Sequence, residues 1–412
     1  MAIRIRTSRV TAAWIVVVAL TIGATIWQSP AHRRRERDDA NPQGIVSSRT
    51  DRDGLAQTIA AMELRLRRQP DDERAAVALA DALLRQTRVT GNAGLALRAE
   101  EVLRRVVADE AAGDAAHYDA HRMLAAVYLS QHRFRDAIRE ADRCRAVRPN
   151  DAWTAGVLGD AHIELGDYDA AFAAFDRMSA LRPDAASYAR TSYARELQGD
   201  LDGALRLMTM AAEATPPLDA ESVAWHHAQI GHLNLELGRV DAARRAFEHA
   251  AFVFPGHPLA VDGLAQVELA AGRREAALRL VQQRIAAAPS PADLALAGEL
   301  LDALGHRDEA ERDYKLAEAA WRSDVPEPAK LARFLAEHHR TIDAAVRLAE
   351  QASADRDDIF TNDALAWAYF NHGRLADARR AIGRALRTGT RDRDIRRHAA
   401  AIAVASDRMA TR

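Results

Sequence analysis

Histidines are the residues whose spacing comes closest to that of a metal site. His117 and His121 stand four residues apart, so they would share one face of a helix and could hold a metal ion between them. No third ligand is indicated beside this pair. The segment AEHHR (336–340) carries two histidines but lacks the order of the HExxH zinc motif. We therefore predict no metal site and expect packed or solvated histidines, including the cluster of His226, His227 and His232.

Catalytic nucleophiles and phosphate-binding loops are not indicated either. Cys144 is the only cysteine, so the chain has no internal disulfide and no multi-cysteine zinc site. Neither a GxSxG motif nor a GxxxxGK[ST] motif occurs. We expect a chain that is not an enzyme and needs no cofactor, with Cys144 buried and inert.

The composition is that of a helical protein without a nucleic-acid partner. Only 5% of the 412 residues are aromatic, alanine, leucine and arginine dominate, and strand-type alternation is rare. A formal net charge of −2 argues against a surface that binds nucleic acid. The chain is therefore expected to be all-α, either as several domains or as one long array.

Prolines divide the chain at a nearly constant interval. Successive intervals of 34, 33, 39 and 34 residues separate Pro149, Pro183, Pro216, Pro255 and Pro289. The preceding interval, from Pro70, is two such periods plus an excess that the segment TRVTGNAGL (87–95) would absorb as a loop. A fixed period near 34 residues indicates a solenoid of repeated units.

The same residue types return at the same positions of each unit. In the unit from Ala152, position eight is Gly159, position fifteen is Gly166 and position twenty-four is Phe175. Position eight is small so that two helices approach closely, and the glycine at fifteen ends the first helix. The large residue at twenty-four fills the space between the pair. No unit can bury its apolar face alone, so neighbours must stack.

This pattern resembles the tetratricopeptide repeat family over roughly residues 73–392. The resemblance implies an all-α, right-handed superhelical solenoid of about nine helix-turn-helix units that contact only their neighbours. The units begin near residues 73, 118, 152, 185, 224, 258, 291, 326 and 359. The unit near 326 departs from the pattern, because Arg333 takes position eight and Arg340 the turn position. A helix at 54–68 should cover one end, and the stretch 392–409 should form a solvating cap helix at the other.

In this family the first helices line a concave groove through positions two, five, nine, twelve and thirteen. Carried over to this chain, those positions hold mainly acidic and aromatic residues: Trp153, Asp160, Glu164, Tyr193, Glu196, Trp225, His232, Glu236, Asp262, Glu299, Phe334, Asp363 and Trp367. Basic entries are few, mainly Arg122 and Lys330. We predict a groove for a basic, apolar peptide; the alternative is a solvated acidic face with aromatics that only pack. The Lys and Asn clamp with which some members hold a partner's terminal carboxylate is absent.

The first 53 residues predict attachment to a membrane. Residues 1–9 are a basic leader, and residues 10–28 contain an uncharged run of 18 residues, VTAAWIVVVALTIGATIW, that is just long enough to span a bilayer as a helix. Residues 29–53 are polar and predict a flexible linker. The expected order is completed by the solenoid at 54–392 and a capping helix and tail at 393–412. The segment SPA (29–31) weakly resembles a cleavage site, so a cleaved signal is an alternative, as is a buried soluble helix.

These features predict a non-catalytic protein–protein interaction scaffold of the cell envelope, anchored by a single N-terminal span. An apolar core after a short basic leader favours the bulk of the chain lying outside the cytoplasm, although the basic residues on the two sides of the span nearly balance. Protein or peptide partners would bind in the concave groove. One alternative is an accessory subunit of a membrane transport or metal-handling system, with histidines as weak ligands. The other is a soluble secreted repeat protein released by signal cleavage.

Overall fold

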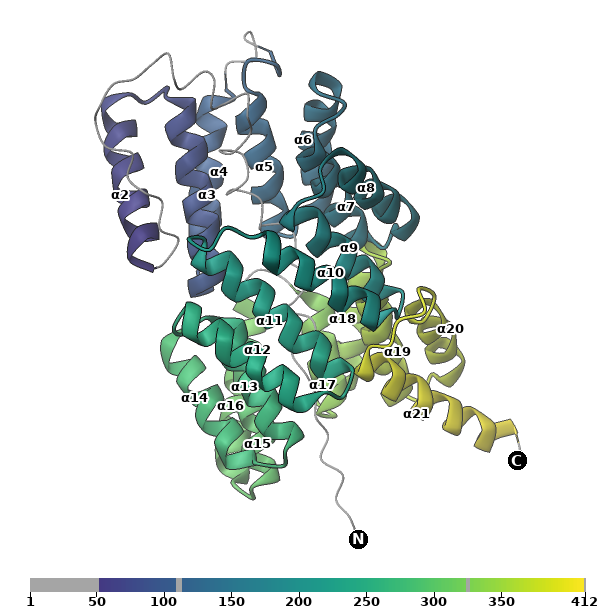
Figure 1. Ribbon diagram of the computed structural model, residues 1–412. Coiled ribbons are helices and arrows are strands. Elements are labelled where there is room, and N and C mark those ends of the chain that lie inside the picture. The colour runs from purple at the N-terminus through teal and green to yellow at the C-terminus, as the bar shows by residue number, and fades with distance from the viewer. Residues whose placement is uncertain (1–51, 109–112, 324–326, 411–412) are drawn as a thin grey trace.

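Residues 52–108, 113–323 and 327–410 are described by the computed structural model, and throughout these ranges the regular elements are helices, α2 to α21 (Figure 1). The predicted leader and membrane helix, and nearly all of the linker, lie outside the described residues. Among the helices that are described, none combines the length and the hydrophobicity that crossing a membrane requires. An all-helical fold, as predicted from the composition, is confirmed for the described ranges.

Nine helical hairpins follow one another between the first and last helices of the described part. They are α3 (Glu73–Thr90) with α4 (Gly94–Val106), α5 (Tyr118–Ser130) with α6 (Phe134–Val147), α7 (Ala152–Leu165) with α8 (Tyr168–Leu181), α9 (Ala185–Leu197) with α10 (Leu201–Ala214), α11 (Ala220–Glu236) with α12 (Val240–Val253), α13 (Pro258–Ala270) with α14 (Arg274–Ala287), α15 (Pro291–Ala303) with α16 (Arg307–Ser323), α17 (Pro328–Glu337) with α18 (Ile342–Asp355), and α19 (Ile359–Asn371) with α20 (Leu375–Ala385). Helix α2 (Arg52–Arg68) packs before them and α21 (Arg393–Ala410) follows them.

The hairpins coincide with the predicted units. Helices α5, α7, α9, α13, α15 and α19 begin at residues 118, 152, 185, 258, 291 and 359, where the units were expected to begin. Two first helices are longer than the pattern predicted. Helix α3 continues through 87–90, so this part of the expected loop is helical, and α11 begins four residues early because Asp219 caps it.

Small residues at position eight allow the two helices of a hairpin to approach each other. A Cβ added at Gly159 would lie 2.3 Å from the ring of Phe175 on α8. The ring of Phe247 on α12 lies against both Gly231 of its own unit and Gly263 of the next. One aromatic side chain therefore joins two successive units, as the stacking of a solenoid requires.

The unit near 326 has a turn that is one residue longer than the others, and this changes its register. His339 and Thr341 both have positive φ, 52° and 39°, where the other units have a single left-handed residue. The fully buried Ala332 therefore takes the small position eight, and Arg333 takes position nine. The prediction that Arg333 takes the small position eight is wrong. The positions of this unit were assigned without allowing for the extra residue in its turn, which shifts them by one.

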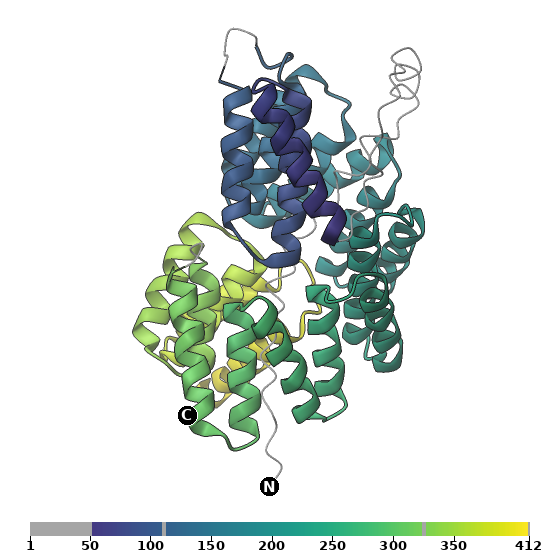
Figure 2. The same ribbon diagram turned by 90° about the vertical axis from the view of Figure 1, so that its left-hand side faces the viewer.

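The solenoid also curves back on itself, which the neighbour-only prediction did not anticipate. Arg85 of α3 pairs with Asp219, 134 positions away, at 3.2 Å. The N–H of Asp357 donates to the carbonyl of Leu165 at 3.1 Å, which joins the end of α7 to the loop between α18 and α19. In both views the early helices α2–α6 stand over the later half of the chain (Figures 1 and 2). The fold therefore has contacts between distant units in addition to those between neighbours, because the curvature of the solenoid accumulates from unit to unit.

Replacing Gly231 with alanine should lower the free energy of unfolding by about 1–3 kcal/mol, because the added Cβ would overpack the site. That Cβ would lie 2.7 Å from the ring of Phe247. Gly383 of α20 is the matched control, since a Cβ there meets nothing within 4 Å. Its replacement with alanine should be neutral, or stabilising by up to about 1 kcal/mol through helix propensity. Urea denaturation of both variants measures the difference, and equal effects would contradict the assigned packing.

Candidate peptide-binding groove

The aromatic side chains of the predicted groove are almost inaccessible to solvent. Between 1% and 8% of the surface is exposed for Trp225, Phe334, Trp153, Trp367 and Tyr193. The guanidinium of Arg122 lies 4.6 Å from the ring centroid of Trp153, at cation–π distance. The chain itself therefore supplies the packing partners of these rings.

Phe334 needs a correction of position. The extra turn residue moves it from position nine to position ten, where its ring packs 4.9 Å from that of Trp321 on α16. It thus contributes to the contact between successive units. The peptide-binding role of the aromatic set stays a prediction.

The acidic side chains of the predicted groove face basic side chains of the same chain. The ion pairs are Asp160–Arg190 at 2.8 Å, Glu164–Arg356 at 2.8 Å, Glu196–His232 at 3.1 Å, Glu236–Arg393 at 3.5 Å, Asp262–Arg284 at 3.2 Å, Glu299–His338 at 3.3 Å and Asp363–His398 at 2.8 Å. An external basic peptide would compete with these internal cations. Its binding to the acidic set also stays a prediction.

Burial decides the protonation of several of these carboxyl groups. Loss of hydration raises the pKa of Asp160 to about 6 and the pKa of Glu164 and of Asp262 to about 7, although each has an arginine beside it. Desolvation therefore outweighs the ion pair at these three positions. The inner face carries less negative charge at neutral pH than its sequence suggests.

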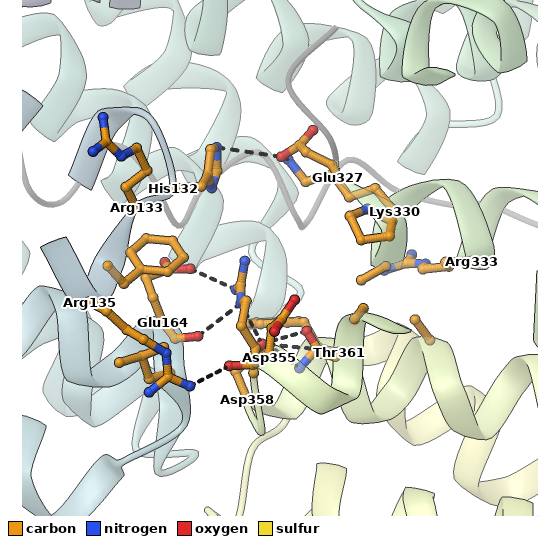
Figure 3. A pocket seen from close by; sticks show the side chains of 18 of the residues that line it. His132, Arg133, Arg135, Glu164, Glu327, Lys330, Arg333, Asp355, Asp358 and Thr361 are labelled. Carbon is orange, nitrogen blue, oxygen red and sulfur yellow. Dashed lines mark hydrogen bonds and ion pairs between the residues drawn. The ribbon is translucent and has the colours of Figure 1, made fainter. Parts of the chain in front are cut away.

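A cavity of about 360 Å³ lies where the early units meet the late ones (Figure 3). Its walls come from the turn between α5 and α6, the end of α7, the first turns of α17, and the junction of α18 with α19. Phe134 and Phe360 supply apolar surface to the wall, and Lys330 and Glu164 are predicted groove positions that reach it. The cavity therefore opens onto the inner surface of the solenoid.

Arg356 connects the two sides of this cavity. Its Nη2 donates to Glu164 Oε2 at 2.8 Å, and its Nε donates to the carbonyl of Glu164 at 3.0 Å and to Asp358 Oδ2 at 3.1 Å. Its guanidinium also lies 5.0 Å from the ring centroid of Phe134. A single side chain thus binds α7, the α18–α19 loop and the α5–α6 turn together.

His132 lies on the opposite wall of the cavity, and its imidazole is neutral at physiological pH. Burial lowers the pKa of its imidazole to about 4, although Glu327 lies 3.7 Å away (Figure 3). Its backbone adopts the left-handed turn conformation, with φ 59°, at the position that most other units give to glycine. The turn thereby projects a ring into the cavity that glycine would not provide.

The final helix, predicted to be a solvating cap, packs against α19 and α20 of the last hairpin and also contacts the inner face. Ile395, His398 and Ile402 of α21 are at most 1% exposed. The ring of His398 stacks on that of Trp367 at 4.0 Å, and Arg397 pairs with Glu337 of α17 at 3.0 Å. The buried residues recur at helical spacing, which is the signal that sequence reasoning missed.

Other groups singled out in the sequence have structural partners. His121 pairs with Glu140 at 2.7 Å and His117 lies 3.3 Å from Glu73. In the described ranges no group of three or more histidine, cysteine or acidic side chains is arranged to hold a metal ion. Cys144 is buried, as predicted, and burial raises the pKa of its thiol to about 12.

Two residues of the cavity had no signal in the sequence. Arg356 follows a polar run at the end of α18, and its contact with Glu164 spans 192 positions. Phe134 begins α6 and was not among the groove positions, because those belong to first helices. Only the closure of the superhelix brings either of them to the inner surface.

Glu164→Gln should remove a pH dependence of stability. Because the folded-state pKa of Glu164, about 7, exceeds the ordinary value, its contribution is complete below about pH 4 and is lost as the pH rises through 7. The stability of the native chain minus that of the variant should therefore fall by roughly 1–3 kcal/mol between pH 4.5 and 7.5.

Glu268→Gln provides the control, since two arginines lower the pKa of Glu268 to about 2. The stabilising effect of the Glu268 carboxylate is lost only at acid pH. The stability of the native chain minus that of Glu268→Gln should therefore stay constant above about pH 5.5. Urea denaturation at each pH measures both differences. A flat profile for Glu164→Gln would show that desolvation does not control this carboxyl group.

The repeat pattern matches a known family model in two stretches. Residues 128–195 and 229–293 each match a model described as tetratricopeptide repeat. They cover parts of the units from residues 118 to 185 and from 224 to 291, where the structure has the expected hairpins. No curated protein sequence is a significant match to the chain.

Solved structures show the same architecture. The chain is similar to one in the crystal structure of the APC/C hetero-tetramer Cut9–Hcn1, with a TM-score of 0.52 and 15% identity over 77% of this chain and 59% of that one. It is also similar to the human IFIT1 dimer with m7Gppp-AAAA, with a TM-score of 0.50 and 16% identity over 81% of this chain and 77% of that one. At such identities the likeness shows the fold alone. The matched stretches, and the hairpins that the structure has in the same residues, show that this chain contains tetratricopeptide repeats.

Proposed function

We propose that this chain is a non-catalytic scaffold that binds a peptide segment of a partner protein in the cavity on its inner surface. Tetratricopeptide repeats support a protein–protein interaction function in general. The observation that carries the proposal is the cavity itself, which has apolar rings and charged groups from both ends of the superhelix. A peptide there would contact two distant parts of the chain at once.

The walls of the cavity suit an extended peptide with both polar and apolar side chains. Phe134 and Phe360 provide apolar surface, while Lys330, Arg356 and Glu327 provide hydrogen-bonding groups of both signs. A volume of about 360 Å³ lies within the range typical of ligand pockets, roughly 300–1,000 Å³, and suits a few residues of a peptide. The bound segment would therefore be short and its recognition specific, and the rest of the partner protein would remain outside the cavity.

The proposal includes a location beside a membrane of the cell envelope. Its support is the uncharged run at 10–28, which follows a basic leader and precedes a polar linker. A single N-terminal span would hold the repeat units close to the bilayer and, in the favoured orientation, outside the cytoplasm. The scaffold would then concentrate partner proteins near that membrane.

A photoreactive benzoylphenylalanine at position 360 should crosslink the full-length chain to a partner protein in native cells. This residue keeps the phenylalanine ring on the cavity wall and extends it with a photoreactive benzoyl group. The same replacement at Phe252 of α12, which is 83% exposed, is the matched control. Adducts specific to position 360, identified by mass spectrometry, are expected. The absence of adducts at 360, or the same adducts at both positions, would contradict binding in the cavity.

N-terminal sequencing and protease treatment of intact cells test the location. An anchored chain should keep its original N-terminus, remain in the membrane fraction, and lose a C-terminal tag to protease added outside the cytoplasmic membrane. A chain that begins shortly after residue 31 and is released in soluble form would instead show the cleaved, secreted alternative. A tag that stays protected until the cytoplasmic membrane is broken would contradict the proposed orientation.

A further inference from the structure

Helix α21 occupies a defined part of the inner surface, which we call the C-terminal seat. The seat consists of Glu236 at the end of α11, Arg333 and Glu337 on α17, and Asp363 and Trp367 on α19. Three of these five residues, Glu236, Asp363 and Trp367, are groove positions predicted from the sequence. The chain's own last helix, which packs mainly on α20 and α19, therefore also contacts predicted groove positions of the late units.

Most charged contacts of the seat join its acids to cations of α21, and Arg333 is the exception, because it pairs with Asp394 of α21. Arg393 of α21 lies 3.5 Å from Glu236, and Arg397 lies 3.0 Å from Glu337. His398 is placed between Asp363, at 2.8 Å, and Glu337, at 3.4 Å. These two carboxylates raise the pKa of the imidazole, which favours its cationic form.

Apolar contacts complete the recognition. Ile395 and Ile402 lie on the same face of α21 as His398 and are fully buried, and the imidazole ring is stacked on Trp367. The buried face of α21 thus has His398 between Ile395 and Ile402, which matches the carboxylates and the Trp367 ring of the seat. An empty seat would leave the carboxylates of Glu337 and Asp363 without these cations, so its chemistry selects a basic amphipathic occupant.

The hold on α21 is restricted to its first half. After Ile402 no described side chain of α21 is buried, and Val404 is 51% exposed. In Figure 1 the end of α21 extends away from the other helices. The cationic residues Arg393 and Arg397 keep 40% and 33% of their side-chain surface exposed, so water and salt reach their ion pairs. Such a helix is suited to exchange.

We propose that the C-terminal seat is a docking site for a basic amphipathic helix of a partner protein, and that α21 is the built-in occupant with which this helix exchanges. The proposal rests on the scaffold function, since the exchanging helix belongs to a partner, but it uses a different surface from the cavity. Because α21 is tethered beside its seat, its effective concentration is high, and a free helix competes poorly until α21 is weakened.

A labelled synthetic peptide with the sequence of residues 391–408 is the probe, and the full-length chain is the receptor. Ile402→Asp introduces a charge at a buried position and should weaken the docking of α21. Val404→Asp introduces the same charge two residues further along α21, at an exposed position, and is the matched control. Hydrogen exchange of residues 393–402 should rise in Ile402→Asp only. Fluorescence anisotropy should show at least tenfold tighter binding of the peptide to Ile402→Asp than to the native chain or to Val404→Asp.

A second peptide tests the charge requirement. Replacement of Arg393, Arg397 and His398 by glutamine in the probe should weaken its binding to Ile402→Asp at least tenfold. Equal binding of the two peptides, or no binding of the native peptide to a chain whose α21 has been released, would overturn the proposal. Equal binding to all three chains would also overturn it, because α21 would then not compete.

Folding of the variants is checked by circular dichroism. If Ile402→Asp loses helical signal beyond α21, His398→Gln serves as the releasing variant, since it removes one cation and keeps the apolar contacts. Should its hydrogen exchange in α21 equal that of the native chain, the claim that the seat holds α21 through cations is wrong. Crosslinking at position 360 reports on the cavity separately, so failure of the scaffold function and failure of helix exchange give different results.

Discussion

The ion pair between Arg356 and Glu164 is the contact on which the shape of the inner surface depends. It joins residues that are 192 positions apart at 2.8 Å, with the carboxylate buried and the guanidinium partly exposed. Around it, the backbone N–H of Ile359 donates to the hydroxyl of Tyr168, and Arg387 donates to the carbonyl of Gly166. A Cβ at Gly166 would collide with the backbone of Asp357 at 2.4 Å, so this glycine serves both the turn and the closure. Without these contacts the solenoid would be an open array stabilised only between neighbours.

Closure changes the electrostatics of the groove. In an open array Glu164 would lack Arg356, which reaches it from a distant unit. Arg190 reaches Asp160 from the adjacent unit and Arg284 reaches Asp262 from the same hairpin, so these pairs need no closure. Burial raises the pKa of all three carboxyl groups. Removing one partner of such a pair leaves an uncompensated buried charge, at a cost of about 3–5 kcal/mol. A partner protein must therefore either use surface that the internal pairs leave open, as in the cavity, or bring cations of its own, as at the seat of α21.

Within the repeats, small departures from the pattern place the residues of the site. The turn at His132 uses a non-glycine residue at positive φ and so presents a ring to the cavity. The turn at 339–341 contains one extra residue, which moves Arg333 from a position that must be small to one that faces the inner surface, where it meets Asp394 of α21. The Phe247 ring, shared by Gly231 and Gly263, shows the opposite case, in which the regular pattern is kept because two units depend on one side chain.

Local patterns in the sequence determined the helices, the hairpin order and the unit boundaries, because spacing along one helix decides which residues share a face. Gly159 and Phe175 could be paired from sequence for that reason, since both belong to one unit. The same reasoning placed the acidic and aromatic residues on first helices, but it could not assign their partners. Arg190 reaches Asp160 from the next unit and His398 reaches Asp363 from α21. Arg356 reaches Glu164 across 192 positions, and only accumulated curvature decides which distant units meet. The tertiary structure alone therefore decided that turns from distant units meet across the inner surface, because a small rotation at each unit interface, summed over many units, is not recorded in any one repeat.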